Sequence, residues 1–175
     1  MRTIVLGLTA AGLLAACSAE PAPGPEEAEV TSLKPGEYEI TAKVDEVRSM
    51  DQTTPATRAK VGGPPTTHRA CVDSDGSIAP DAFAEAGDKC TASSAYVRNG
   101  RLNMQLTCTR PAGQLTQLVD GDFKVDSFAA KLRTATYFDK SGDYEMTRTV
   151  AGKRVGDCPA ASATSPTAPA GKAKP

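Results

Sequence analysis

The chain has 175 residues, and its 20 lysines and arginines nearly balance its 21 aspartates and glutamates, which gives a formal net charge of −1. This balance argues against nucleic acid as a partner, because surfaces that bind nucleic acid carry a clear positive excess. Tryptophan is absent and only 5% of the residues are aromatic, so the chain has few large side chains with which to build a core.

The first 16 residues predict a signal peptide of the kind found in bacterial lipoproteins. Arg2 precedes a short apolar stretch, and Leu14-Ala15-Ala16-Cys17 is similar to the lipobox at the cleavage site of these proteins. The stretch is shorter than the about 20 apolar residues that a membrane-spanning helix needs. The resemblance implies cleavage before Cys17, a diacylglyceryl group on its sulfur and an acyl group such as palmitate on its new amine, which together anchor the mature chain.

The residue after the lipidated cysteine bears on the location of the protein. Ser18, in place of an aspartate, resembles the arrangement that directs lipoproteins to the outer membrane. We therefore expect a protein of the cell envelope that is lipid-anchored through Cys17 and faces the periplasm, most simply at the outer membrane. The alternative is an ordinary secretory peptide in which Cys17 is an incidental small residue.

Composition divides the mature chain into three parts. Residues 17–32 are rich in proline, glutamate and alanine, which predicts a disordered linker. Residues 33–159 carry the apolar patterns of one folded domain. Residues 160–175 contain only alanine, serine, threonine, proline, glycine and lysine, so we expect a disordered tail.

Four cysteines remain once Cys17 is assigned to lipid: Cys71, Cys90, Cys108 and Cys158. An even set of cysteines in an exported protein predicts disulfides, which persist in oxidising compartments. A four-thiolate zinc site is disfavoured, because structural zinc sites usually take their ligands in closely spaced pairs and the sequence has no such pair. We predict two disulfides and no metal site, and four cysteines allow three pairings.

The domain begins with a pattern typical of a strand. After a turn signal at residues 34–36, apolar and polar residues alternate strictly from 37 to 45, which predicts a half-buried strand with Tyr38 on its inner face. Residues 49–65 are rich in threonine, proline and glycine and predict a long loop. A second strand is expected at 67–72.

A short helix is the next predicted element. Residues 80–86 carry Pro80, which suits the first turn of a helix, and Gly87 follows as a stop signal. We expect Phe83 to be the buried anchor of this helix.

The stretch from Cys90 to Cys108 predicts a hairpin around Asn99-Gly100. A three-residue turn over 98–100, with Gly100 in the left-handed region, would pair Val97 with Arg101. The inward pairs that follow are Tyr96 with Leu102, Ser94 with Met104, Ala92 with Leu106, and Cys90 with Cys108. A two-residue turn would shift the register by one and separate the sulfurs onto opposite faces. We therefore favour a Cys90–Cys108 disulfide, which leaves Cys71 for Cys158.

Three more strands complete the predicted domain. The first covers 114–119 and ends in a turn at 120–122, and the second is a long strand from about 127 onward. After a turn at 139–143, the last strand places Tyr144, Met146 and Val150 on its inner side. Arg148 is the one charged residue at an inward position, where it would pair with an acid, line a pocket or indicate a different register.

Together these elements predict a mainly β fold. About seven short-spaced strands in a single antiparallel meander, with one short helix and two disulfides, would bury one face by forming a curled sheet or a partly closed barrel.

Catalytic chemistry finds little support in the sequence. His68 is the only histidine, and its loop-like surroundings predict an exposed side chain. No GxSxG, HExxH, phosphate-binding glycine loop or dinucleotide motif is present. We expect a protein that is not an enzyme, with no catalytic residues and no cofactor.

Several tracts resemble the proteobacterial exported family called domain of unknown function 3617. They are Cys71-Val72, the tract 102–113, and the closing tract 146–159 with its Gly152-Lys153-Arg154-Val155-Gly156-Asp157-Cys158 ending. The start, Pro35-Gly36-Glu37-Tyr38-Glu39-Ile40, also fits, so the resemblance covers about 33–159. It implies the fold and an exported location, and it supplies no catalytic residues.

The leading expectation is an envelope lipoprotein whose non-enzymatic domain binds a protein partner or a small ligand in the periplasm. One alternative is an inhibitor of a secreted hydrolase, in which the braced stretch between Cys71 and Cys90 would insert into the target. A second alternative is a carrier that holds a small apolar ligand within the curled sheet.

Overall fold

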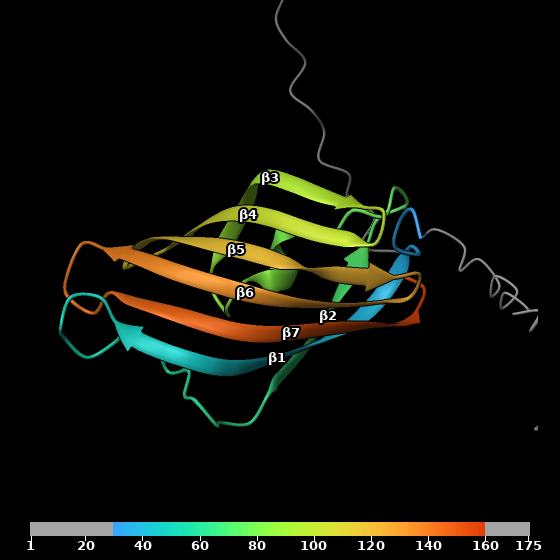
Figure 1. The fold of residues 1–175 in the computed structure, drawn as a ribbon. Coiled ribbons are helices and arrows are strands. Elements are labelled where there is room, and N and C mark those ends of the chain that lie inside the picture. The colour runs from blue at the N-terminus through green and yellow to red at the C-terminus, as the bar shows by residue number, and fades with distance from the viewer. Residues whose placement is uncertain (1–29, 160–175) are drawn as a thin grey trace, which may run out of the picture.

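The computed structural model describes residues 30–159, which form a single seven-stranded sheet (Figure 1). The predicted signal peptide, Cys17, most of the predicted linker and the predicted tail lie outside these residues. The strands are β1 (Gly36–Ser49), β2 (Thr66–Val72), β3 (Lys89–Arg98), β4 (Arg101–Arg110), β5 (Gly113–Lys124), β6 (Ser127–Phe138) and β7 (Tyr144–Gly156). One short 3-10 helix, η1 (Pro80–Phe83), lies between β2 and β3.

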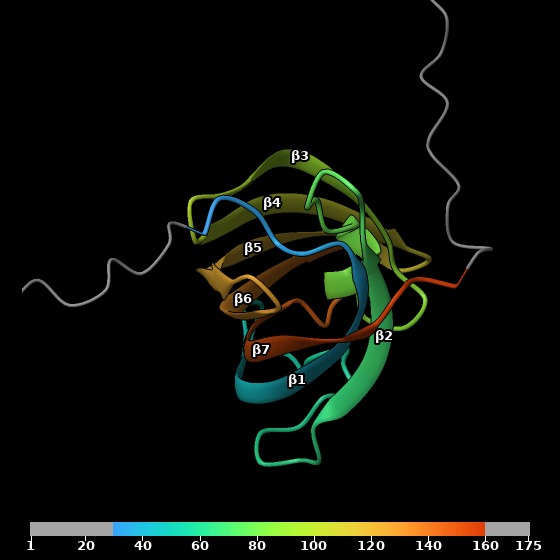
Figure 2. The same cartoon turned by 90° about the vertical axis from the view of Figure 1, so that its right-hand side faces the viewer.

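Every strand pair is antiparallel, and the order across the sheet is β2-β1-β7-β6-β5-β4-β3. Strands β3 to β7 form a meander, and β1 then pairs with β7 and with β2. The sheet curls into a half-barrel with β2 and β3 at its two edges (Figure 2). The connection from β2 to β3 crosses the open side between these edges. The predicted mainly β, curled antiparallel fold with two disulfides is confirmed.

The core lies on the concave side of the sheet. On β1, Tyr38, Ile40 and Ala42 are buried while their sequence neighbours are partly or fully exposed, as the alternating pattern predicts. The same alternation runs through β4 to β7. Few aromatic rings contribute, and Phe128 lies at their centre, with ring centroids 6.2 Å from Tyr38 and 6.0 Å from Phe83. The inward face of β7 is as predicted, Arg148 included.

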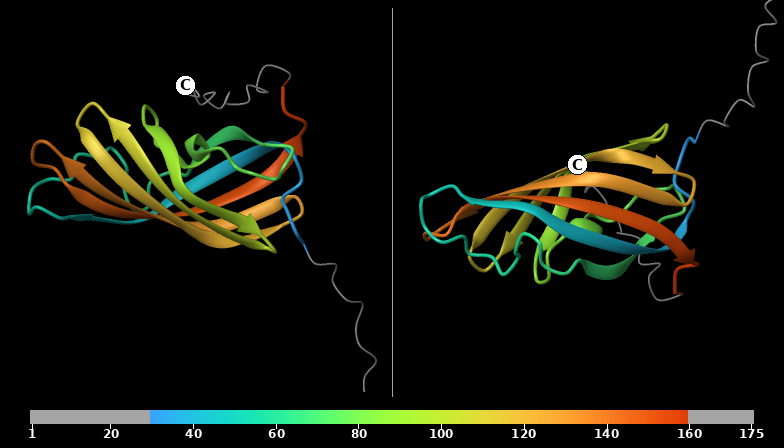
Figure 3. Two further views of the ribbon diagram at one scale, coloured as in Figure 1. Left: turned by 90° about the horizontal axis from the view of Figure 1, so that it is seen from above. Right: turned by 60° about the horizontal axis from the view of Figure 1, so that its bottom comes forward.

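The segment before β1 closes one end of the half-barrel (Figure 3). It crosses two hairpin tips, because the Thr31 carbonyl accepts from the backbone N–H of Asn99 at 3.2 Å and the N–H of Lys34 donates to the Val125 carbonyl at 2.7 Å. Leu33 is buried beneath this crossing. The folded unit therefore starts close to residue 33, where the apolar pattern begins.

The β3–β4 hairpin corrects the predicted turn. Asn99 and Gly100 form a two-residue turn with φ of 52° and 73°, so Arg98 pairs with Arg101 and Val97 with Leu102. The predicted pairs Val97–Arg101, Tyr96–Leu102 and Ser94–Met104 are wrong. A β-bulge at Ser93 then shifts the register back by one, which restores Ala92–Leu106 and sets Cys90 opposite Cys108.

Both cysteine pairs are disulfides in the structure. Cys90 is bonded to Cys108 and Cys71 to Cys158, which is the pairing that the sequence favours. Each bond fastens an edge strand: Cys90 lies on β3 and Cys71 on β2. Disulfides of this kind indicate that the domain folds outside the cytoplasm.

The turn predicted at 120–122 is also wrong, because β5 continues through it to Lys124. A Cβ on Gly121 would collide with the backbone of Ala129 and Ala130 on β6, so the glycine permits close strand packing instead of a turn. The flanking aspartates face outward and have partners on β4: Asn103 donates to Asp120 at 3.0 Å, and Arg101 donates to Asp122 at 3.1 Å.

The predicted helix at 80–86 is reduced to one 3-10 turn, and Ala84 is already extended. The reason lies in the carbonyl groups that a longer helix would use. The Phe83 carbonyl accepts from Arg148 at 3.0 Å, and the Ala82 carbonyl lies 2.9 Å from Nε2 of His68. Phe83 itself is buried at 2% exposure, as predicted.

Candidate functional site

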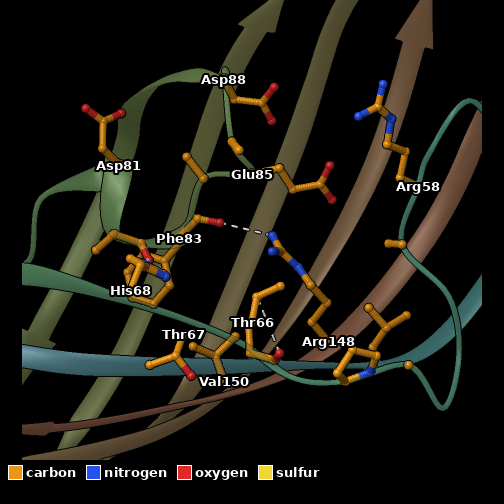
Figure 4. A pocket seen from close by; sticks show the side chains of 18 of the residues that line it. Arg58, Thr66, Thr67, His68, Asp81, Phe83, Glu85, Asp88, Arg148 and Val150 are labelled. Atoms are coloured by element: carbon orange, nitrogen blue, oxygen red, sulfur yellow. Dashed lines mark hydrogen bonds between the residues drawn. The ribbon is translucent and has the colours of Figure 1, made fainter.

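A cavity of about 840 Å³ lies on the concave side of the half-barrel (Figure 4). Three parts of the chain enclose it: the middle of β1 and β7, the start of β2 with the loop before it, and the η1 segment, which here means η1 together with the residues that follow it as far as Asp88. Its apolar lining comes from Ala42, Val44, Ala59, Pro64, Ala82, Phe83, Ala84, Ala86 and Val150. The volume falls within the range usual for small-molecule sites, about 300–1,000 Å³.

Arg148 lines the cavity and is buried, with 7% of its surface exposed. Its Nη2 donates to the carbonyl of Phe83 at 3.0 Å, and its Nε has no hydrogen-bond partner among the described residues. Burial lowers the pKa of Arg148, while the negative charge of Glu85 acts in the opposite direction. Of the three sequence alternatives for this arginine, the structure shows the one in which it lines a pocket.

Glu85 and Asp88 also line the cavity and bring negative charge to it, and both form ion pairs with Arg110. The Nη2 of Arg110 lies 2.6 Å from Asp88 and 3.1 Å from Glu85. Burial alone would lower the pKa of Arg110, but the hydrogen bond that Arg110 donates to Asp88 and the nearby negative charge outweigh it and raise the pKa. Arg110 also donates to the Tyr144 hydroxyl at 3.3 Å and lies over the Phe138 ring.

His68 is not the exposed residue that its sequence context predicts. Its side chain lines the cavity and is half-buried, with Nε2 beside the carbonyl of Ala82 at 2.9 Å. The prediction is wrong because His68 lies within β2 and not in a loop, and the alternation of this strand turns its side chain toward η1.

The outer rim is basic. Arg58 and Lys60 lie on the loop between β1 and β2 and are exposed to solvent. The start of this loop is fixed to the β6–β7 turn, because the Asp51 carboxylate accepts from the backbone N–H of Gly142 at 2.6 Å and of Asp143 at 3.1 Å. The loop forms one wall of the cavity, and these hydrogen bonds hold its first residues in place.

Sequence reasoning found Arg148 and missed most of the other polar lining. Glu85 and Asp88 lie in a segment without regular structure, and Arg110 precedes a turn, so no periodic signal marked them. Only the folded chain brings these positions within reach of β7. Throughout residues 30–159, no three cysteine, histidine or acidic side chains are grouped as metal ligands, and no helix has the length and hydropathy to cross a membrane.

Comparison with known families agrees with the extent of this fold. The family model described as "Protein of unknown function (DUF3617)" matches residues 33–158. The chain belongs to the DUF3617 family. No curated protein and no solved structure matches the chain, so the family match brings no activity with it.

The DUF3617 domain thus has a mostly apolar cavity that is lined by one buried guanidinium, that of Arg148, whose Nε has no hydrogen-bond partner among the described residues. Its two acids are held by Arg110, which ties them to the wall of the cavity. Apolar walls with a few fixed polar groups are typical of sites that bind and orient a small molecule.

Proposed function

We propose that this DUF3617 domain binds a small, largely apolar ligand in the cavity of its half-barrel and acts as a carrier in the periplasm, without catalysing a reaction. The observation that carries the proposal is the cavity of about 840 Å³ with its row of alanine, valine, proline and phenylalanine side chains. Burying apolar ligand surface against such walls contributes roughly 25 cal/mol per Å² before the costs of association.

We further propose that the domain is held at the periplasmic face of the outer membrane by lipid on Cys17. The support is the lipobox-like Leu14-Ala15-Ala16-Cys17 and Ser18 after it. An anchored carrier would take up and release its ligand next to a membrane. Intact-mass analysis of the native protein tests the anchor: it should start at Cys17 and carry lipid, and Cys17→Ser should release it from membranes. An unmodified start would refute it.

The inhibitor hypothesis has less support. The stretch between Cys71 and Cys90 would have to project in order to enter a hydrolase, but Ile78, Ala82 and Phe83 within it are buried. The stretch contributes to the wall of the cavity. We therefore favour the carrier.

Mass spectrometry of organic extracts tests the carrier directly. Full-length protein purified from its native envelope should release an apolar compound that Val44→Trp protein does not, because Val44 is half-buried and the larger ring would fill the cavity. The control is Leu118→Trp on the outer face of β5, where Leu118 is 49% exposed. Since the natural chain has no tryptophan, fluorescence of each single tryptophan reports whether the variant is folded. Equal extracts from both variants would contradict the carrier.

A further inference from the structure

The polar end of the cavity limits which ligand it can hold. Arg148 is 7% exposed, and the one acceptor that it contacts among the described residues is the neutral carbonyl of Phe83. A guanidinium has five N–H donors. Its Nε is buried without a partner, and leaving such donors unpaired is costly. Arg148 is therefore suited to receive an acceptor from a bound molecule.

The acids of the domain do not fill this role. Asp88 and Glu85 are both in contact with Arg110, and no ion pair within residues 30–159 includes Arg148. Glu85 nevertheless acts on Arg148 through its charge. Arg110 and Arg148 therefore match Glu85 and Asp88 at this end of the cavity, and their formal charges cancel. The third acid of the lining, Asp81, is exposed, and its carboxylate accepts from the backbone N–H of Cys90 at 3.3 Å.

This balance decides the charge of the ligand. A carboxylate placed against Arg148 would add a third negative charge beside Glu85 and Asp88, and an ammonium group would face the guanidinium itself. A neutral carbonyl oxygen accepts from Arg148 and leaves the charge balance unchanged. Arg58 and Lys60 do not alter this conclusion, because they are solvent-exposed at the rim and are screened there.

The lining around Arg148 defines the rest of the ligand. Val44 lies opposite Arg148 in the β1–β7 register, Val150 is the next inward residue on β7, and Phe83 presents its carbonyl from the other side of the cavity. Figure 4 shows the guanidinium of Arg148 pointing to the Phe83 carbonyl from an apolar floor that includes Val150. An apolar body placed on this floor would put its polar end at Arg148.

We propose that the cavity selects uncharged, carbonyl-bearing apolar molecules, such as esters or amides of aliphatic acids, and that Arg148 donates to their carbonyl oxygen. The proposal rests on the carrier function proposed above and specifies its ligand class. Arg148 is then the residue that determines specificity, and the apolar lining provides most of the contact.

Three probes with the same chain length test the proposal: octanamide, octanoate and octylammonium. Binding to full-length protein in bilayer nanodiscs is measured by titration calorimetry at pH 7, with protein-free nanodiscs subtracted. We expect octanamide to bind at least tenfold more tightly than either charged probe. Arg148→Met should weaken octanamide about tenfold, the loss expected for one hydrogen bond to a charged group. Arg133→Met, on the outer face of β6, is the matched control and should change nothing.

The probe comparison needs no variant, so it remains decisive if Arg148→Met fails to fold. Octanoate or octylammonium binding as tightly as octanamide overturns the ligand class, and the carrier function stands if Val44→Trp still abolishes that binding. Equal octanamide affinity in folded Arg148→Met and natural protein overturns the role of Arg148. No binding of any probe, together with extracts that contain no apolar compound, overturns the carrier function and with it this inference.

Discussion

Two inward arginines of the half-barrel have opposite surroundings. Arg110 contacts two carboxylates, a hydroxyl and an aromatic ring. Arg148 contacts one backbone carbonyl. Alternation along β7 predicted that Arg148 points inward, but its partner comes from a residue 65 positions earlier in the chain. Contacts of this range depend on the tertiary fold and leave no mark on the local pattern.

Replacing Arg110 should destabilise the domain strongly. Arg110→Met leaves the buried carboxylate of Asp88 and the partly buried one of Glu85 without a positive partner, which we expect to cost about 3 kcal/mol of unfolding free energy. Urea unfolding measures the loss. Adding Asp88→Asn should recover part of it, because the uncompensated charge is removed. If the double variant is less stable than Arg110→Met alone, this account of the cluster is wrong.

Asp51 links stability to pH. The hydroxyl of Thr53 and the backbone N–H of Gly142 hydrogen-bond to its carboxylate and hold the pKa of Asp51 well below the ordinary value of about 3.9. The folded state therefore gains stability from Asp51 above that ordinary value and loses it as the pH falls toward the lowered pKa. Asp51→Asn should lower the urea midpoint at pH 7.

The difference between Asp51→Asn and the natural protein should shrink steadily in acid. Asp139→Asn is the control, because the Asp139 carboxylate makes no hydrogen bond or ion pair in the described part of the chain, and it should leave the midpoint unchanged. An Asp51→Asn effect of the same size at pH 7 and in strong acid would show that the carboxylate charge is not the cause.

At the scale of elements, the β3–β4 hairpin shows where local rules succeed and where they fail. Asn-Gly correctly indicated a turn between two strands. The predicted length of the turn was wrong, because the turn has two residues and not three. The bulge at Ser93 compensates for this difference in register, and no sequence signal indicated the bulge. The pairing of Cys90 with Cys108 was favoured on a register that holds for only part of the ladder.

Deleting Ser93 distinguishes the observed hairpin from the predicted one. In the structure the bulge residue is extra, so its removal should leave a regular ladder with Cys90 still opposite Cys108. The disulfide should form, and alkylation followed by mass measurement should find no free thiol. In a regular ladder with a three-residue turn, the same deletion would move Cys90 opposite Thr107, and free thiols would appear. That result would refute the observed register.

At the scale of the whole molecule, the two disulfides secure the two edges of an open sheet. Edge strands have one unpaired side and fray or pair with other chains unless they are held. Cys71–Cys158 ties β2 to the chain after β7, and Cys90–Cys108 ties β3 to β4. A half-barrel with few aromatic residues can therefore stay open on one side.

Removing each disulfide should reveal their unequal contributions. Cys71 and Cys158 are separated by 87 residues, and Cys90 and Cys108 by 18. On the loop-entropy account, replacing the first pair with alanine should cost on the order of 4 kcal/mol and the second about 3 kcal/mol. Urea unfolding of the two double variants tests this order. A larger loss for the short loop would contradict the entropic explanation.

The fold class followed from the sequence because alternation, turns and cysteines are local or countable features. The cavity did not, because it is assembled from β1, β7, the loop before β2 and the η1 segment. These parts meet only when the connection between the two edge strands crosses the open side of the sheet. Its charged lining, Glu85 and Asp88 included, depends on that crossing.

The central claim is that the cavity holds a ligand, and a crystal structure of full-length protein purified from its native envelope tests it most directly. The account predicts continuous density for an apolar molecule along Val44 and Val150, with its polar end within hydrogen-bonding distance of Arg148. A cavity filled by the protein's own side chains, or by water alone at every contact with Arg148, would contradict it.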